Sequence, residues 1–369
     1  MSANLIEHLA RIPDPRDTKN RRYPLEEILF LCISAIISGA EGWEAIERFG
    51  HAKLDWLRRF VPMANGIPSH DTVAWVMARL SPTQFQSFFV GWVQSLSQIS
   101  HGEIISIDGK TARRSYDKKR SKGAIHMVSA WASLNQVSMG QVMTDEKSNE
   151  ITAIPALLEL LEIQGGLVTI DAMGCQTAIA EQIVDQKADY ALAVKGNQGL
   201  LFEAIDDYFT QALEHTFAHV DHEFFETIDK GHGRIDQRRY WLVSDLSTLP
   251  DKQRWKQLSA IGMVERTCRQ NGRVSVERRY YILSFDRDVE RFAQAVRCHW
   301  GVENKLHWVL DVVFREDDSR IRRDHAPANF NTMRQTCLNL LRKESSKISL
   351  KQKRFKAALN DVYRAKLLF

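Results

Sequence analysis

Short apolar strands alternate with amphipathic helices between residues 101 and 213, and this alternation constrains the fold most strongly. GLVTIDA and DYALAVK have the composition of buried strands, and QTAIAEQIVDQ between them has the spacing of a helix. A second helix, GLLFEAIDDYFTQAL, follows. Such alternation is typical of an α/β sheet whose two faces are covered by helices.

Three strands are predicted to precede this alternation. EIISIDGKT, GAIHMVSAWASLN and QVSMGQVMTDEK are β-rich, with a turn around Asn135 to Val137, and they suggest a meander. The sheet is therefore expected to be mixed. Residues 218–288 then break the alternation with long β-rich stretches and an Asn271-Gly272 hairpin signal, which predicts a β-rich insertion.

The two ends of the chain are predicted to be helical. The run ILFLCISAIISGA (28–40) is too short to cross a bilayer and is interpreted as a buried helix. In IPSHDTVAWVMARL, Pro68 and a Ser69 or Asp71 cap begin another helix, which either packs or belongs to a DNA-reading helix-turn-helix. We expect a helical domain over 1–100, a core over 101–345 with its insertion at about 218–288, and a basic helical tail over 346–369.

Composition narrows the class of protein only in part. The 50 basic and 46 acidic residues give a net charge of +4, which does not by itself indicate nucleic-acid binding, so local clusters matter more. Five cysteines without a C-x-x-C pair argue against a disulfide framework and against a cysteine-rich zinc site. A reducing cytoplasm fits this cysteine usage.

Two predicted strands each end in an aspartate. Asp108 ends ISID and Asp171 ends LVTID, positions from which a carboxylate can face a cleft at the sheet edge. Either residue alone could instead cap the element that follows. Because Mg²⁺ prefers hard oxygen ligands, paired aspartates joined by a third acid would suit a site for two metal ions.

The stretch HWGVENKLHWVLDVVFREDD (299–318) supplies a candidate for that third acid. On an α-helix, His299, Glu303, His307 and Asp311 would share one face, beside a stripe of Trp300, Asn304 and Trp308. An ordinary amphipathic surface helix is the simpler interpretation. A zinc site of His299, Glu303 and His307 is a further alternative, but its spacing differs from H-E-x-x-H and it leaves both aspartates unexplained.

The segments ISIDGK, VTIDAMG with the later VKGNQ, and HWGVENKLHWVLDVVFREDDSR resemble the H-repeat-associated insertion-sequence transposases. These form a branch of the DDE transposases with a ribonuclease-H-like core, and the resemblance spans nearly the whole chain. It implies Asp108, Asp171 and Glu303 as catalytic and metal-binding residues, with two Mg²⁺ ions that Mn²⁺ can replace. It also implies cleavage and strand transfer at the ends of an insertion sequence.

The same resemblance implies the partners and the place of action. The partners would be double-stranded DNA of the terminal inverted repeats and of the target, with a homo-oligomer on DNA and no membrane. The expected location is the bacterial cytoplasm, in association with the nucleoid. The β-rich segment would interrupt the core before the helix that carries Glu303.

One departure from related hairpin-forming transposases bears on the mechanism. Those relatives carry a Tyr seven residues and an Arg four residues before the acid, and a Lys seven residues after it. Here Val296, His299 and Leu310 stand at those positions. A DNA hairpin intermediate therefore does not follow from the resemblance.

Basic and aromatic residues near the acids are the predicted DNA contacts. The run KTARRSYDKKRSK gathers seven basic residues after Asp108, enough to neutralise several phosphates, although a solvated turn is the alternative. Arginines that flank EDD could instead pair with Glu316 to Asp318. The predicted contacts are Lys110, Arg113, Arg114, Lys118, Lys119, Lys195, Asn197, Gln198, His299, Trp300, Asn304, His307, Trp308, Arg315 and Arg320. A catalytically silent, domesticated DNA-binding protein remains the alternative function.

Overall fold

The computed structural model describes residues 5–96, 102–116, 123–144, 150–231 and 233–369. The chain divides into two compact units. The first comprises Met1–Gln98, Gly109–Asn149 and Glu303–Phe369, and the second comprises Ile99–Asp108 and Glu150–Val302. The first unit thus combines segments from both ends of the chain. Strand β1 (Ile104–Thr111) contributes to both units.

The first unit is mainly helical. Its helices, apart from short 3₁₀ turns, are α1 (Leu5–Leu9), α2 (Leu25–Ile37), α3 (Trp43–Leu57), α4 (His70–Arg79), α5 (Pro82–Leu96), α10 (Trp308–Val312), α11 (Ala326–Lys343), α12 (Leu350–Leu359) and α13 (Asp361–Leu368). Its strands β2 (His126–Ala132) and β3 (Val137–Thr144) are antiparallel. In the strand order of the sheet, β2 is the neighbour of β1.

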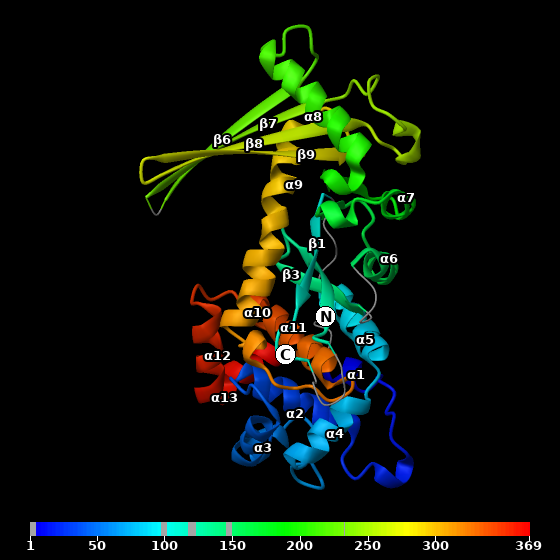
Figure 1. The fold of residues 1–369 in the computed structure, drawn as a ribbon. Helices are drawn as coiled ribbons and strands as arrows, with labels where there is room; N and C mark the ends of the chain where they lie inside the picture. The colour runs from blue at the N-terminus through cyan, green and yellow to red at the C-terminus, as the bar shows by residue number, and fades with distance from the viewer. Residues whose placement is uncertain (1–4, 97–101, 117–122, 145–149, 232) are drawn as a thin grey trace. The chain divides into compact units, whose positions relative to one another are not determined.

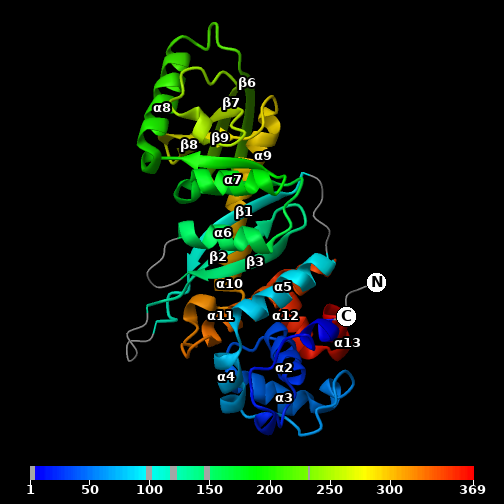
Figure 2. The ribbon, with the colours of Figure 1, turned by 90° about the vertical axis from the view of Figure 1, so that its right-hand side faces the viewer.

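Helices α2 and α11 form the centre of the first unit. Almost every residue of α2 is buried, as the apolar run predicted. Helix α11 packs against α2, α4, α5 and β3, and its labelled ribbon lies among these helices in Figure 2. Its polar residues bond inward: Asn329 donates to the carbonyls of Met77 and Leu80, and Asn339 donates to the carbonyl of Ser138. These bonds give the amide groups of Asn329 and Asn339 hydrogen-bond partners inside the core.

The second unit contains most of the strands. They are β4 (Leu167–Ile170), β5 (Asp189–Val194), β6 (Glu223–Gly231), β7 (Arg234–Val243), β8 (Ala260–Gln270) and β9 (Arg273–Leu283), with helices α6 (Glu150–Leu160), α7 (Thr177–Asp185), α8 (Gly199–Glu214) and α9 (Val289–Gly301). The strand order here is β1-β4-β5-β9-β8-β7-β6. Strands β1, β4 and β5 are parallel, and β9 joins β5 in the antiparallel sense. The predicted mixed, ribonuclease-H-like sheet is confirmed.

Strands β6 to β9 form an antiparallel meander within the predicted β-rich segment. Figure 1 shows α8 and α9 on opposite sides of this meander. Side chains alternate between the two faces of a strand, so Tyr240 and Tyr281 contact Phe292 of α9. On the other face, Tyr280 stacks on Phe209 of α8 with ring centroids 6.0 Å apart. The alternation of aromatic residues in β7 and β9 thus fixes a helix on each face.

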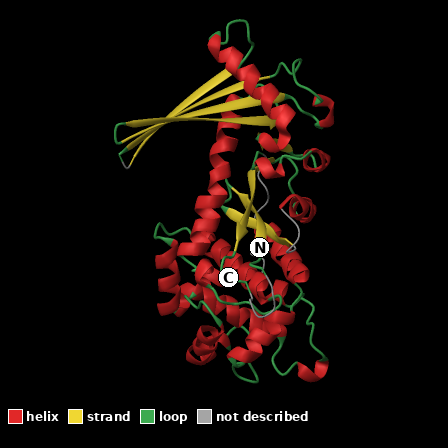
Figure 3. Cartoon of the chain, in the orientation of Figure 1, coloured by secondary structure: helices red, strands yellow, loops and turns green. Residues whose placement is uncertain are grey.

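Local signals in the sequence are also found in the structure. Asn271 and Gly272 adopt φ values of 50° and 73°, as the predicted hairpin turn requires. Ser69 caps α4 by accepting from the amide of Thr72 at 3.3 Å. Among the described residues, no helix combines the length and apolar character needed to span a bilayer. Figure 3 shows the described helices and strands by type.

Candidate active site

Asp108 and Asp171 occupy corresponding positions on two neighbouring strands, with Asp108 inside β1 and Asp171 directly after β4. Strand β1 runs parallel to β4 with Ile107 opposite Ile170. The residue after each of these isoleucines is an aspartate. Asp171 also caps the 3₁₀ turn that follows, accepting from the amide of Met173 at 3.0 Å and that of Gly174 at 3.4 Å. The capping interpretation is therefore correct for Asp171, and it holds the carboxylate in a fixed place.

Negative charge is concentrated around Asp171. Its pKa is raised by burial and then by the charges of Glu150 and Asp108, against two backbone hydrogen bonds that lower it. Glu150 is the first residue of α6 and was not among the predicted site residues. A carboxyl group surrounded in this way gains from a nearby cation. In the sequence, Glu150 is recognisable only as an acidic residue at the start of a predicted helix. Acidic residues are common at that position, so the pattern does not indicate a functional site.

His299 lies within electrostatic reach of both aspartates. Its ring nitrogen Nδ1 is 3.1 Å from the hydroxyl oxygen of Thr169, a residue of β4. Burial lowers the pKa of His299, while the charges of Asp108 and Asp171 act in the opposite direction. The second unit therefore brings together three of the predicted site residues.

The donor atoms at these positions suit a hard divalent cation. The carboxylates of Asp108 and Asp171 offer oxygen ligands of the kind that Mg²⁺ prefers, and their mutual repulsion favours a bound positive charge. Within the described part of the chain, no three His, Cys, Asp or Glu side chains gather in a metal-binding cluster. The two aspartates thus fit a metal ion as a partial ligand set.

Asn197 and Gln198 brace the loop that follows Asp171. The Asn197 amide donates to the carbonyl of Ala172 at 2.6 Å, and the Gln198 amide donates to that of Cys175 at 2.9 Å. Lys195 before them is exposed. The VKGNQ motif therefore has a structural role in this unit, because its two amides hold the 3₁₀ turn that Asp171 caps.

Trp300 follows His299 in the last turn of α9, and its indole is exposed. Its side chain is 41% exposed, and the guanidinium of Arg279 in β9 lies 4.9 Å from its ring centroid. This cation–π contact orients the indole against the meander.

Glu303 belongs to the first unit and lies in a π-helical segment, Val302–His307. The regular α-helix expected over this stretch is therefore wrong, and the four-residue stripe does not continue through it. Glu303, Asn304 and Trp308 are exposed, whereas His307 is buried. π-Helical turns are rare and frequently occur at functional sites. No periodic pattern in the sequence predicted this change of helix type.

Lys110 is committed to ion pairs inside the first unit. Its ammonium binds the carboxylates of Asp311 and Glu316, and its side chain is only 14% exposed. Burial acts to lower the pKa of Lys110, but Glu316 and Asp311 outweigh it and raise the pKa. Since this charge is neutralised within the protein, the structure does not support Lys110 as a phosphate ligand.

The remaining basic residues near EDD are exposed and partly paired. Arg113 lies 3.5 Å from Asp317, Arg114 lies 3.3 Å from Asp318, and Arg315 also pairs with Asp318 at 3.2 Å. Arg320 is exposed. Lys118 and Lys119 lie outside the described residues. The alternative of pairing between arginines and EDD is thus realised for Arg315, and the acidic turn also binds the arginines after β1.

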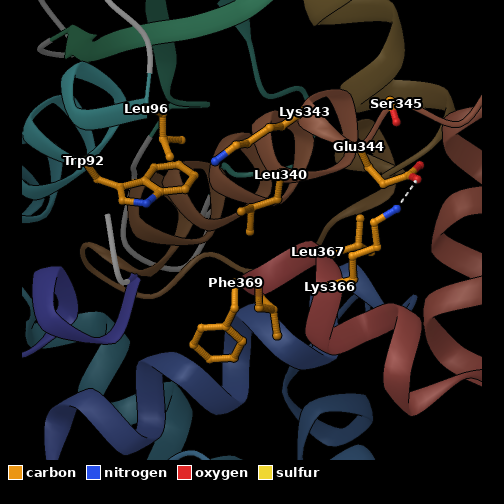
Figure 4. Close-up of a pocket in the computed structure, with 10 residues that line it drawn as sticks. Trp92, Leu96, Leu340, Lys343, Glu344, Ser345, Lys366, Leu367 and Phe369 are labelled. Carbon is orange, nitrogen blue, oxygen red and sulfur yellow. Dashed lines mark hydrogen bonds and ion pairs between the residues drawn. The ribbon is translucent and has the colours of Figure 1, made fainter. Parts of the chain in front are cut away.

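A pocket in the first unit contains none of the predicted site residues. In Figure 4, Trp92 and Leu340 lie on one side of it and Phe369 on another, and Lys366 reaches Glu344 at 3.3 Å. The carboxylate of Glu344 is shared between Lys366 and Lys353, which lies outside the pocket lining.

Comparison with known proteins agrees with this arrangement. Residues 99–340 match the family described as Transposase DDE domain, and residues 6–93 match the family described as DDE_Tnp_1-associated. The chain is 44% identical to "Putative transposase YncI" of Escherichia coli O157:H7, over 98% of this chain and 93% of that protein. It is 43% identical to "H repeat-associated putative transposase YhhI" of Escherichia coli strain K12, over 99% and 97%.

Among solved structures, the chain is similar to a cryo-EM structure of the piggyBac transposase synaptic complex with hairpin DNA. The TM-score is 0.44 at 10% identity, over 98% of this chain and 78% of that chain. The match over residues 99–340 and the near full-length relatives, together with the paired aspartates on a ribonuclease-H-like sheet, establish the family. The chain belongs to the DDE transposases, in the branch of the H-repeat-associated transposases.

Proposed function

We propose that this protein is a metal-dependent DNA transposase that cleaves the ends of an insertion sequence and joins them to target DNA. The observation that carries the proposal is the placement of Asp108 and Asp171 at corresponding positions of adjacent parallel strands, where burial and then the charges of Glu150 and Asp108 raise the pKa of Asp171. Membership of the DDE family supports the same chemistry. The protein would act in the bacterial cytoplasm on nucleoid DNA.

Asp108, Asp171 and Glu303 are the proposed catalytic triad. Asp108 and Asp171 would hold the metal ions through their carboxylates. The hydrogen bonds that Asp171 accepts from the amides of Met173 and Gly174 would keep its side chain in place. Glu303 follows His299 by four residues, and it is the third acid that the family resemblance supplies. Two Mg²⁺ ions, or Mn²⁺ in their place, would activate the attacking oxygen and stabilise the leaving one when bound.

The protein's own residues would bind and orient the DNA. We propose that exposed basic and polar groups contact the phosphates, with Arg113, Arg114 and Arg320 in the first unit and Lys195 in the second. Asn304 and the indoles of Trp300 and Trp308 would contact bases displaced near the cut. The helical region 1–100 would contribute further contacts, and a homo-oligomer would assemble on paired element ends.

Cleavage of labelled element-end DNA tests the proposal. The wild type should cut in Mg²⁺ or Mn²⁺, and Asp108→Asn, Asp171→Asn and Glu303→Gln should each lose cutting while still shifting the DNA in a gel. Glu290→Gln, an exposed acid on α9, is the matched control and should cut normally. Tight binding without cutting by the wild type would favour the alternative, a domesticated DNA-binding protein. Full activity in all three variants would exclude the triad.

A further inference from the structure

A chain of hydrogen bonds connects the ring of His299, through Thr169 and Ser106, to the carbonyl of Cys298, the preceding residue in α9. The Nδ1 atom of His299 is 3.1 Å from Oγ1 of Thr169, and that Oγ1 is 3.2 Å from Oγ of Ser106. Ser106 in turn bonds the carbonyl oxygen of Cys298 at 3.2 Å. Ser106 and Thr169 are buried and each lies two residues before an aspartate of the proposed site.

The carbonyl at the end of this chain fixes the direction of every bond. A carbonyl oxygen can only accept, and a hydroxyl group has a single proton to donate. Ser106 therefore donates to Cys298, which leaves it to accept from Thr169. Thr169 has then used its proton, so its oxygen must accept from His299. The Nδ1 atom of His299 consequently carries a proton.

Burial favours the neutral form of the His299 imidazole. It lowers the pKa of His299, although the charges of Asp108 and Asp171 favour the protonated ring. A neutral imidazole carries one proton, so a ring protonated at Nδ1 has an unprotonated Nε2 with a lone pair. Nothing in this arrangement leaves His299 a second N–H to donate.

We infer that Ser106 and Thr169 are positioning residues that fix the Nδ1–H tautomer of His299, so that Nε2 accepts a hydrogen bond from the attacking hydroxyl group at the aspartate pair. That hydroxyl belongs to water in the cleavage step and to a DNA 3′ end in strand transfer, an identification that rests on the proposed function. The hairpin-forming relatives have an arginine at this position, which can only donate. The change from arginine to histidine therefore replaces a phosphate-binding donor with an acceptor for O–H.

Nitrogen NMR of the full-length protein tests the tautomer without any DNA. Histidine is labelled with ¹⁵N, and the signals of His299 are identified by their absence from His299→Gln. At neutral pH, Nδ1 should appear as the protonated nitrogen and Nε2 as the unprotonated one. Thr169→Ser keeps the hydroxyl and should keep this pattern, whereas Thr169→Val should give a mixture of tautomers. A proton on Nε2 in the wild type, or an unchanged pattern in Thr169→Val, would overturn the inference.

Two substitutions of His299 then test the acceptor in the cleavage assay. An Asn side chain can place its amide near the position of Nδ1 but has no atom near Nε2, whereas a Gln side chain can place a carbonyl oxygen there. His299→Asn should cut at least about tenfold more slowly than His299→Gln, the loss expected for one hydrogen bond. Equal rates in the two variants would contradict the acceptor role. A wild type that cuts no DNA would refute the proposed function but leave the tautomer result intact.

Discussion

The ammonium of Lys110 binds the carboxylate of Glu316, whose side chain is 1% exposed and also lies 3.9 Å from Arg334. Lys110 comes two residues after Asp108, so this buried pair anchors the end of β1 within the first unit. Arg334 is itself fully buried, and burial lowers its pKa to about 10. The carboxylate of Glu316 and its two cations, Lys110 and Arg334, stabilise one another, because a buried charge without a partner costs free energy.

Removing Lys110 should therefore destabilise the fold. Lys110→Met leaves Glu316 and Asp311 with one cation fewer and should lower the free energy of unfolding by about 3 kcal/mol. Urea denaturation followed by circular dichroism measures this change. Lys351→Met, at an exposed site on α12, is the control and should change stability by less than about 0.5 kcal/mol. Equal stability of the two variants would show that the pair contributes nothing.

Acid should destabilise the protein partly through Glu344. Burial of this carboxyl acts to raise its pKa, but hydrogen bonds from neighbouring side chains outweigh burial and lower the pKa from 4.5 to about 2. These donors are Ser346, Lys353, Tyr363 and Lys366. A carboxyl with a depressed pKa in the folded state stabilises the fold above its unfolded pKa, and this stabilisation disappears as the pH falls from about 4.5 towards 2.

The matched variant for this prediction is Glu344→Gln. Thermal unfolding between pH 2 and pH 7 should give a lower Tm for Glu344→Gln at neutral pH, with a shallower fall in acid than in the wild type. Parallel curves for the two proteins would contradict the assigned pKa.

Gly262 should not tolerate a larger side chain. A Cβ atom at this position in β8 would lie 2.6 Å from Cζ of Phe292, whose ring is fully buried beneath the meander. Gly262→Ala should therefore cost about 1–3 kcal/mol, the usual effect of overpacking. Gly231→Ala has open space around its Cβ and serves as the control. The double variant Gly262→Ala with Phe292→Leu should lose less stability than the sum of the two single changes.

The acidic turn Glu316–Asp318 should weaken DNA binding by competing for arginines. Asp317 and Asp318 lie within 3.5 Å of Arg113 and Arg114, respectively. Asp317→Asn with Asp318→Asn should raise the affinity for DNA severalfold at low salt and steepen its salt dependence, because more cations become available to phosphates. Stability should change little, since exposed ion pairs contribute about 0–1 kcal/mol.

The control removes the same charge at a distance along the chain. Glu203→Gln with Asp207→Asn, both exposed on α8, should raise affinity less than the change at the acidic turn. Fluorescence anisotropy with labelled duplex DNA at several salt concentrations distinguishes the two variants. An equal increase in both would indicate net charge as the cause.

Periodicity predicted the parts of the fold that depend on local pattern. Strands β1, β4 and β5 and helices α2, α7 and α8 lie where the apolar spacing placed them, because each buries a face that the sequence marks. The aspartates were identifiable for the same reason, since each directly follows a run of buried strand residues, although β1 continues past Asp108 to Thr111. The π-helix around Glu303 was not predictable, because its turn depends on packing and leaves no periodic signal.

Charged residues gave the least reliable predictions. Lys110 stands in a basic run that suggests a solvated surface, yet its partners come from residues about 200 positions later in the chain. Arg364 in the basic tail is likewise buried, with its guanidinium 3.9 Å from the ring centroid of Trp56. A sequence pattern does not reveal which distant residue pairs with a charged side chain. The partners of Lys110 and Arg364 are therefore known only from the structure.

The central claim is that Asp108 and Asp171 bind the metal ions that cleave DNA, and a change of ligand atom tests it most directly. Asp108→Cys and Asp171→Cys replace a carboxylate oxygen with sulfur, which binds Mg²⁺ poorly and Mn²⁺ better. Cleavage of labelled element-end DNA should be lost in Mg²⁺ and restored in Mn²⁺ for both variants, with the wild type active in both ions. Undiminished cleavage by either variant in Mg²⁺ would contradict the claim.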